Sequence, residues 1–221
     1  MAGGLHHVGL RGHDESVVFV DDADRSSFAA LLYEASRRLA VALHAYALLD
    51  TEIHLLATPV QANALGRLMQ SIGRGYVSQF NRRHGRRGSL WEGRFRCSVL
   101  QAETALLDAT VLLENLAVEH GLVARAADWP WSSAAHHLGR VRDQLISEHP
   151  SYWMIGNTPF ERESAHANLL VAGLPTVRRE ALLKALQRGH AVGSTDFVAT
   201  VGVTSGRAVV PRPRGRPKRP K

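Results

Sequence analysis

Hydrophobic and polar residues follow two different periods along the first 120 residues. Short apolar runs at 6–12, 17–21, 41–49 and 52–58 have the length and alternation of strands, and the tight connection between the last two predicts a hairpin. Elsewhere, apolar residues recur every three or four positions. This spacing predicts helices from Asp22 or Asp24 to about Ala40, from Asn63 past Phe80, and from 103 to 120, with an extended segment at 89–101.

The order of these elements is strand–strand–helix–strand–strand–helix, which predicts an α+β fold with one antiparallel sheet and helices on one face. After residue 133 the pattern changes. Two short helices are expected between 159 and 189 and a weaker one from 194 to 206. The Arg/Pro-rich end cannot bury an apolar face and is expected to be disordered. We therefore divide the chain into a domain at 1–143, a helical extension at 144–206 and a basic tail at 207–221.

Positive charge is concentrated in two blocks. The tail 207–221 carries seven basic residues and no acid, and the segment 67–96 carries eight arginines against Glu92 alone. Since the whole chain has a net charge of +7, the remainder is mildly acidic. Two dense basic blocks on an acidic background are typical of phosphate binding. The single cysteine, Cys97, excludes a disulfide framework within the chain, and no apolar run has the length of a membrane span. We expect a cytoplasmic protein associated with the nucleoid.

Several stretches resemble the REP-associated tyrosine transposases, a branch of the single-strand HUH transposases. The resemblance includes His-His-Val at 6–8, His-Ala-Tyr at 44–46, His-Leu-Leu at 54–56, and Asp-Trp-Pro-Trp-Ser-Ser at 128–133. Its most specific part is the segment FNRRHGRRGSLWEGRFR at 80–96. The resemblance covers nearly the whole chain. It implies a ferredoxin-like fold, a divalent metal held by two histidines on a central strand, and a helix-borne tyrosine that attacks single-stranded DNA and becomes joined to its 5′ phosphate.

This sequence departs from the family pattern at the positions that carry the chemistry. Glu52 stands at the first histidine position, while His54 keeps the second. Because side chains at i and i+2 of a strand share a face and glutamate is a hard oxygen ligand, the pair can still hold Mg²⁺ or Mn²⁺, though weakly. The tyrosine position falls at Leu112, and the polar position one helical turn later is Leu116, with Asn115 turned aside. Leucine cannot form a covalent intermediate, so the resemblance implies a scaffold that has lost strand transfer.

The remaining motifs concern nucleic acid rather than catalysis. Aromatic rings interleave with the arginines of the middle block, an arrangement that suits stacking of unpaired bases. The predicted DNA-binding residues of this block are Arg74, Arg82, Arg83, Arg86, Arg87, Trp91, Arg94 and Arg96. In the tail, Arg214 and Arg216 flank a glycine as in the AT-hook, which lies in an A·T minor groove, although a nonspecific tether fits the tail equally well.

Two further expectations concern rings elsewhere in the chain. The twelve histidines show no zinc-type spacing, so we expect surface or capping roles for them. Trp129 and Trp131 are expected to be structural, and Tyr76 to be a core or DNA-stacking residue rather than a nucleophile.

Three functional hypotheses follow. The preferred one is a DNA-binding protein that holds hairpin or single-stranded DNA without cutting it. The second is an active metal-dependent single-strand endonuclease or transposase, and the third is an RNA-binding module that uses the same basic surface. Cleavage of hairpin DNA separates the first two, and competition between RNA and DNA hairpins separates the third.

Overall fold

The computed structural model describes residues 1–205, and its first four strands and two helices follow the order β–α–β–β–α–β. These are β1 (Leu5–Arg11), α1 (Asp22–Arg38), β2 (Val41–Leu48), β3 (Glu52–Pro59), α2 (Ala64–Arg83) and β4 (Arg96–Leu100). The strands form one antiparallel sheet in the order β2-β3-β1-β4. This order of elements and strands is ferredoxin-like, and it confirms the predicted α+β class.

After β4 the chain forms a further series of helices that pack beside the sheet. These are α3 (Ala102–Glu119), α4 (Ala134–His137), α5 (Pro159–Ala172), α6 (Thr176–Arg188) and α7 (Thr195–Ser205), with short 3-10 turns at Ala126–Asp128 and Pro150–Ile155. Another 3-10 turn, His13–Glu15, lies between β1 and α1. The two helices predicted between 159 and 189 are α5 and α6, and the weaker one is α7. Within residues 1–205, no helix combines the length and the hydropathy that crossing a bilayer requires.

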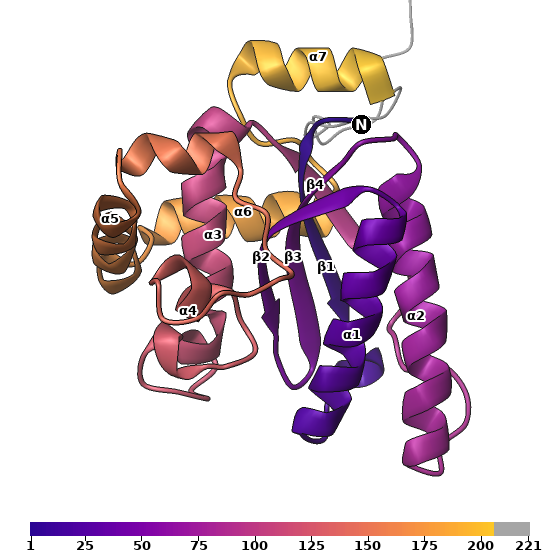
Figure 1. Cartoon of the computed structure of the whole chain (residues 1–221). Coiled ribbons are helices and arrows are strands. Elements are labelled where there is room, and N and C mark those ends of the chain that lie inside the picture. The colour runs from indigo at the N-terminus through magenta and orange to yellow at the C-terminus, as the bar shows by residue number, and fades with distance from the viewer. Residues whose placement is uncertain (206–221) are drawn as a thin grey trace, which may run out of the picture.

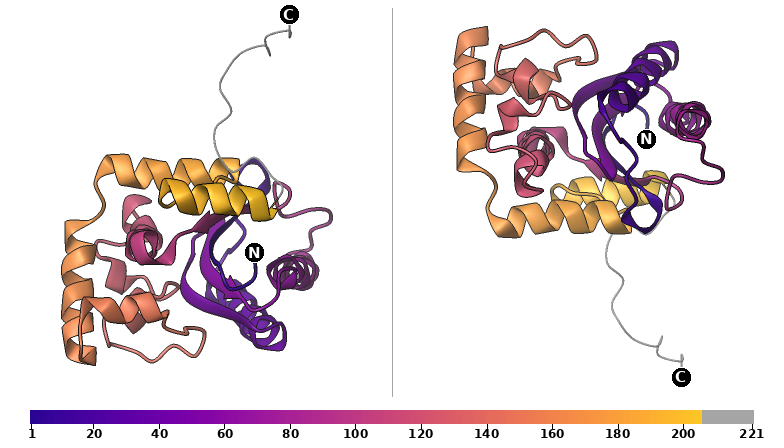
Figure 2. Two further views of the ribbon diagram at one scale, coloured as in Figure 1. Left: turned by 90° about the horizontal axis from the view of Figure 1, so that it is seen from above. Right: turned by 90° about the horizontal axis from the view of Figure 1, so that it is seen from below.

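Helices cover both faces of the sheet, as Figures 1 and 2 show. One core lies between the sheet and the pair α1 and α2, and includes Val8, Leu55 and Phe28. A second core lies between the opposite face and α3, and includes Leu56, Leu100 and Leu112. The prediction of helices on one face therefore describes the ferredoxin-like unit, whereas α3 and α6 cover the second face. The reason is that the strands are apolar on both faces, and an apolar face needs cover.

The segment at 17–21 is not the strand that its apolar run predicts. Val18 and Phe19 are fully buried, but their backbone N–H groups both donate to the carbonyl of Asp50, and Tyr76 donates its hydroxyl to the carbonyl of Val18. Burial rather than strand pairing thus explains the run. Helix α1 is capped by Asp21, whose carboxylate accepts from the N–H of Asp24, instead of by either residue predicted.

Segments from the C-terminal half pair with both outer strands of the sheet. Along β2, the N–H of Ser147 donates to the carbonyl of Leu43, and the N–H of Leu48 donates to the carbonyl of Trp131. Along β4, the N–H of Val192 donates to the carbonyl of Val99. The proposed extension thus shares backbone hydrogen bonds with the sheet.

Candidate nucleic-acid interface

Glu52 and His54 project from β3 onto the face that α3 covers, as their spacing predicts. Both side chains are buried, with 8% and 5% of the residue exposed. On the neighbouring strand β1, Arg11 lies opposite Glu52 and Gly9 lies opposite His54. Glycine at position 9 lets α6 pack closely against β1 beside His54, because a Cβ there would collide with the side chain of Leu186.

A chain of polar contacts links these residues. The Nε2 atom of His54 lies 3.4 Å from Oε1 of Glu52, and its Nδ1 shares a 3.0 Å hydrogen bond with Nε2 of the fully buried His7. Arg11 donates from Nε and Nη2 to Oε2 of Glu52, each at 3.2 Å. Burial alone would raise the pKa of Glu52, but hydrogen bonding and charge from His54 and Arg11 outweigh it and hold the pKa at about 2. Glu52 is therefore an ionised carboxylate that Arg11 partly neutralises.

Helix α3 presents an apolar face to this cluster until its last turn. Leu112, which the sequence resemblance places at the tyrosine position, is 1% exposed and packs in the second core, while Leu116 lines the cavity beside His54. One turn further, Nε2 of His120 lies 3.6 Å from Oε1 of Glu52. Asn115 donates its amide to the carbonyl of Leu170, away from the cluster.

The cluster opens into a cavity of about 970 Å³ that α6 encloses. We call it the α6 cleft, and its charged and histidine lining consists of Arg11, Glu52, His54, Glu92, Arg94, Arg96, His120, Arg179, Glu180, Lys184 and Arg188. Basic residues outnumber acids in this list. The cleft therefore combines ligands suited to a divalent ion with cations suited to phosphate.

A second cavity, of about 1140 Å³, lies between α2 and the segment that leads into β4. We call it the α2 groove; Arg67, Arg74, Trp91, Arg94 and Phe95 all line it. Trp91 is half-buried and tilts against the ring of Tyr76 at 6.0 Å. Because Arg94 lines both the groove and the α6 cleft, one basic surface connects the two cavities.

The other arginines of the middle block lie at the far end of α2 and in the turn after it. The guanidinium of Arg83 is bound to the carboxylates of Asp21 and Asp24, and that of Arg86 stacks over Phe80 at 5.7 Å. Arg82 and Arg87 are exposed. The structure thus divides the predicted DNA-binding residues into a groove set and a turn set, and within the turn set Arg83 is a fold-stabilising residue. Arg96 donates to the carbonyl of Gln187 from the edge of the α6 cleft.

The expectation of surface roles for the histidines is wrong for half of them. His6, His7, His44, His54, His137 and His166 are all buried. Two of these, with Glu114, form the one group within residues 1–205 whose three ligand atoms lie within 4.8 Å of one another, and this group can hold a metal ion. No local sequence pattern indicates this group, since its three residues are separated by 23 and 29 positions.

Residues missed at the sequence level are Arg11 and His120 in the α6 cleft, Arg67 in the α2 groove, and the buried His7, which contacts His54. His7 and Arg11 follow from strand alternation once β1 is placed beside β3, whereas His120 and Arg67 needed the helix orientations. Trp129 and Trp131 pack against the two cores, as predicted. Tyr76 is a core residue. Arg214 and Arg216 of the AT-hook-like tail lie outside the described residues.

The sequence by itself matches no protein-family model and no curated protein. Among solved structures, the chain is similar to a REP-associated tyrosine transposase bound to a REP hairpin, with a TM-score of 0.52 and 16% identity over 68% of this chain and 88% of that one. It is more distantly similar to a protein of Deinococcus radiodurans R1 assigned as a transposase, with a TM-score of 0.36 and 13% identity over 42% of this chain and 75% of that one. The first similarity establishes that the chain has a transposase-like fold.

Proposed function

We propose that this chain is a degenerate member of the REP-associated tyrosine transposase family that binds hairpin or single-stranded DNA without transferring strands. The observation that carries the proposal is the α2 groove, where three arginines and two half-buried aromatic rings line one channel. Arginine forks bind phosphate oxygens, and exposed ring faces stack on bases that are not paired. The solved structure that shares this fold holds a DNA hairpin.

The apolar face of α3 supports the loss of strand transfer. A covalent phosphodiester exchange needs a nucleophilic side chain on the helix that faces the metal ligands. Leu112 and Leu116 occupy that face, and neither has an atom that can attack phosphorus. On this proposal Glu52 and His54 hold Mg²⁺ or Mn²⁺ only weakly, with phosphate oxygens completing the ligands, because Arg11 competes for the carboxylate. The metal would supply charge neutralisation at a bound phosphate.

One observation favours a second function, a metal-dependent endonuclease that uses water. His120 lies beside the same carboxylate oxygen as His54, so Glu52, His54 and His120 bring metal-ligating atoms together in a cleft with a basic lining. Such an enzyme would cut hairpin DNA in Mg²⁺ or Mn²⁺ and leave no protein–DNA adduct. Incubating labelled hairpin DNA with the protein in each metal and in chelator distinguishes the two functions: the proposed binding protein leaves the DNA intact in all three.

The binding proposal is tested by replacing the groove arginines. The variant Arg67→Gln/Arg74→Gln/Arg94→Gln removes three cations from the α2 groove. The matched control, Arg37→Gln/Arg125→Gln/Arg142→Gln, removes three exposed cations that line neither cavity. Each phosphate contact contributes roughly 0.7 to the slope of log affinity against log salt for single strands. We expect the groove variant to lower that slope by about 2 and the control to leave it nearly unchanged.

Equal losses in the groove variant and the control would refute the α2 groove as the binding site. The affinity of the protein is measured in parallel for a DNA hairpin, a single-stranded DNA, a plain DNA duplex and an RNA hairpin. The comparison gives the preference of the protein among these four nucleic acids. We expect the DNA hairpin or the single strand to bind more tightly than the duplex, and a preference for the RNA hairpin would favour the RNA-binding hypothesis.

The tail adds a separable contribution under the same proposal. Arg214 and Arg216 are proposed to contact DNA through the minor groove or through phosphates, without reading hairpin structure. Removing 207–221 then weakens binding to all four nucleic acids by a similar factor.

A further inference from the structure

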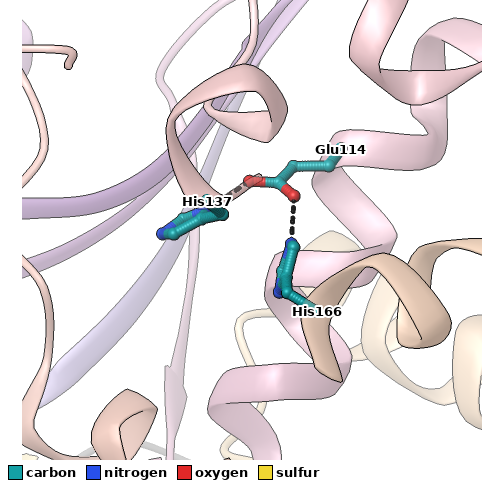
Figure 3. Close-up of side chains that lie close together, drawn as sticks. All are labelled: Glu114, His137 and His166. Carbon is teal, nitrogen blue, oxygen red and sulfur yellow. Dashed lines mark hydrogen bonds and ion pairs between the residues drawn. The ribbon is translucent and has the colours of Figure 1, made fainter. Parts of the chain in front are cut away.

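Three helices bring a carboxylate and two imidazoles together in the interior, and none of these three side chains lines either cavity. Glu114 comes from α3, His137 from the end of α4, and His166 from α5, as Figure 3 shows. Glu114 and His166 are 0% exposed and His137 is 4% exposed. The Nδ1 atom of His137 lies 2.6 Å from Oε1 of Glu114, and the Nε2 atom of His166 lies 2.7 Å from Oε2. The carboxylate therefore lies between the two rings, and each oxygen faces one nitrogen.

A buried carboxylate in such a place needs a compensating positive charge. Hydrogen bonds from neutral imidazoles satisfy its oxygens but leave the charge uncompensated. Both oxygens of Glu114 face imidazole nitrogens at hydrogen-bond distance in the interior, the arrangement of a carboxylate rather than of a carboxylic acid. The compensating charge must then be a proton held by the histidines or a metal ion held by all three groups.

The surroundings of the cluster favour the metal ion. The Tyr152 ring lies 4.8 Å from the His137 ring and 5.6 Å from the His166 ring, and its hydroxyl is buried with no hydrogen-bond partner. Ser133 donates its hydroxyl to Oε1 of Glu114 at 2.5 Å, which places a further oxygen at the cluster. Buried polar atoms without partners are rare and costly. A buried carboxylate, two imidazoles and the Ser133 hydroxyl together form a donor set of the kind that holds a metal ion.

The ligand types and spacing select the class of ion. Two imidazoles and one carboxylate suit zinc and similar transition metals, whereas Mg²⁺ and Ca²⁺ prefer oxygen ligands throughout. A tetrahedral zinc site with bonds of about 2.0–2.2 Å separates its ligand atoms by about 3.3 Å. The three ligand atoms here already lie within 4.8 Å of one another, so small side-chain movements complete the site.

We propose that Glu114, His137 and His166 form a structural zinc site that fastens the C-terminal extension to the transposase-like unit. Each ligand comes from a different helix, and α5 has few other contacts with the unit beyond α3 and α4. A single ion thus links α5 to α3, and through α3 to the sheet. Ser133 or a water molecule completes the four ligands. This site is distinct from Glu52 and His54, and its role does not depend on DNA binding.

The test uses the full chain, stripped with a chelator and then titrated with zinc chloride. We expect one zinc per chain by elemental analysis and a rise in melting temperature of about 5 °C or more. Magnesium chloride should give no rise. Glu114→Gln and His166→Asn should lose the bound zinc, whereas the control His54→Asn, which alters the α6 cleft, should keep it. Zinc that is lost in His54→Asn but kept in His166→Asn would overturn the proposal.

Cobalt chloride gives a second readout that needs no variant and so is independent of whether a variant folds. Four-coordinate Co²⁺ absorbs strongly in the visible range, while hexa-aqua Co²⁺ absorbs weakly. We expect the unaltered protein to develop the strong bands at one equivalent of cobalt, and added zinc to abolish them. An unchanged spectrum, together with no zinc uptake by the unaltered chain, refutes the site and leaves a shared proton as the compensating charge.

Discussion

His44 makes the stability of this protein depend on pH in a calculable way. Its Nδ1–H donates to the carbonyl of Ser147 at 2.6 Å, and its Nε2 accepts from the hydroxyl of Thr58 at 2.9 Å. Burial lowers the pKa of His44 from 6.5 to about 4, and the nearby His149 and His137 add to the effect while the Ser147 hydrogen bond opposes it. The folded state therefore favours the neutral ring, chiefly because a charged ring would have to be buried.

The sign and size follow from proton linkage. Between pH 6.5 and pH 4 the unfolded chain binds a proton at His44 that the folded chain does not, so the contribution to stability is present above pH 6.5 and is lost as the pH falls. With these two pKa values, the free energy of unfolding decreases by about 2 kcal/mol between pH 7 and pH 5. The pKa of His6 is also lowered to about 4, first by burial, and it adds a similar loss.

Urea unfolding of the unaltered protein and of His44→Gln at pH 7 and pH 5 isolates the contribution of His44 to the pH dependence of stability. Glutamine can donate to the Ser147 carbonyl but takes up no proton. We expect the variant to lose about 2 kcal/mol less than the unaltered protein between the two pH values, whatever its stability at pH 7. The contribution of His6 is present in both proteins and cancels. If the free energies of the two proteins fall in parallel, His44 is not the group that resists protonation, and the reasoning fails.

Three other outcomes are expected. Arg83→Met should lower the melting temperature by a few degrees, because it removes the ion pair from the buried carboxylate of Asp24. It should leave the slope of log DNA affinity against log salt unchanged, and a flatter slope in filter binding would show that Arg83 contacts DNA. Leu112→Tyr combined with Glu52→His should cost about 1–3 kcal/mol by overpacking and should give no adduct with hairpin DNA in mass spectrometry, whereas any tyrosine-linked product would show that the scaffold is still competent. Deleting 207–221 should reduce the salt slope while the ratio of hairpin to duplex affinity stays constant, and a lost ratio would mean that the tail reads structure.

The apolar periodicity of the sequence is sufficient to predict those helices and strands whose buried residues follow a regular helical or strand repeat. The apolar face of α2 and the β2–β3 hairpin were predicted because each repeats a period over many residues. The strand predicted at 17–21 is wrong because Val18 and Phe19 are buried without strand partners. A short apolar run indicates burial but does not indicate whether the segment pairs with a neighbouring strand. The cover of the second face by α3 depends on tertiary packing, which a helical stripe does not specify.

The candidate site divides in the same way. The shared face of Glu52 and His54 follows from the two-residue period of a strand, and the proposal that strand transfer is lost follows from the identity of Leu112. The contact between His54 and His7, and the approach of His120, depend on which strand and which helix lie beside β3. The Glu114 cluster depends on three helices that meet in the interior, so no spacing in the sequence could indicate it.

The hydrogen bonds along the outer strands have a consequence for self-association. An open strand edge offers N–H and C=O groups to another chain and is a route to aggregation. Here Ser147 pairs with β2, while on the β4 side Val192 both donates to Val99 and accepts from the N–H of Gln101. A chain that ends before residue 190 keeps every strand of the ferredoxin-like unit but exposes the β4 edge. Such a shortened protein is therefore prone to pair edge to edge with its own copies. In the full chain, the segment after α6 covers the β4 edge and so prevents that pairing.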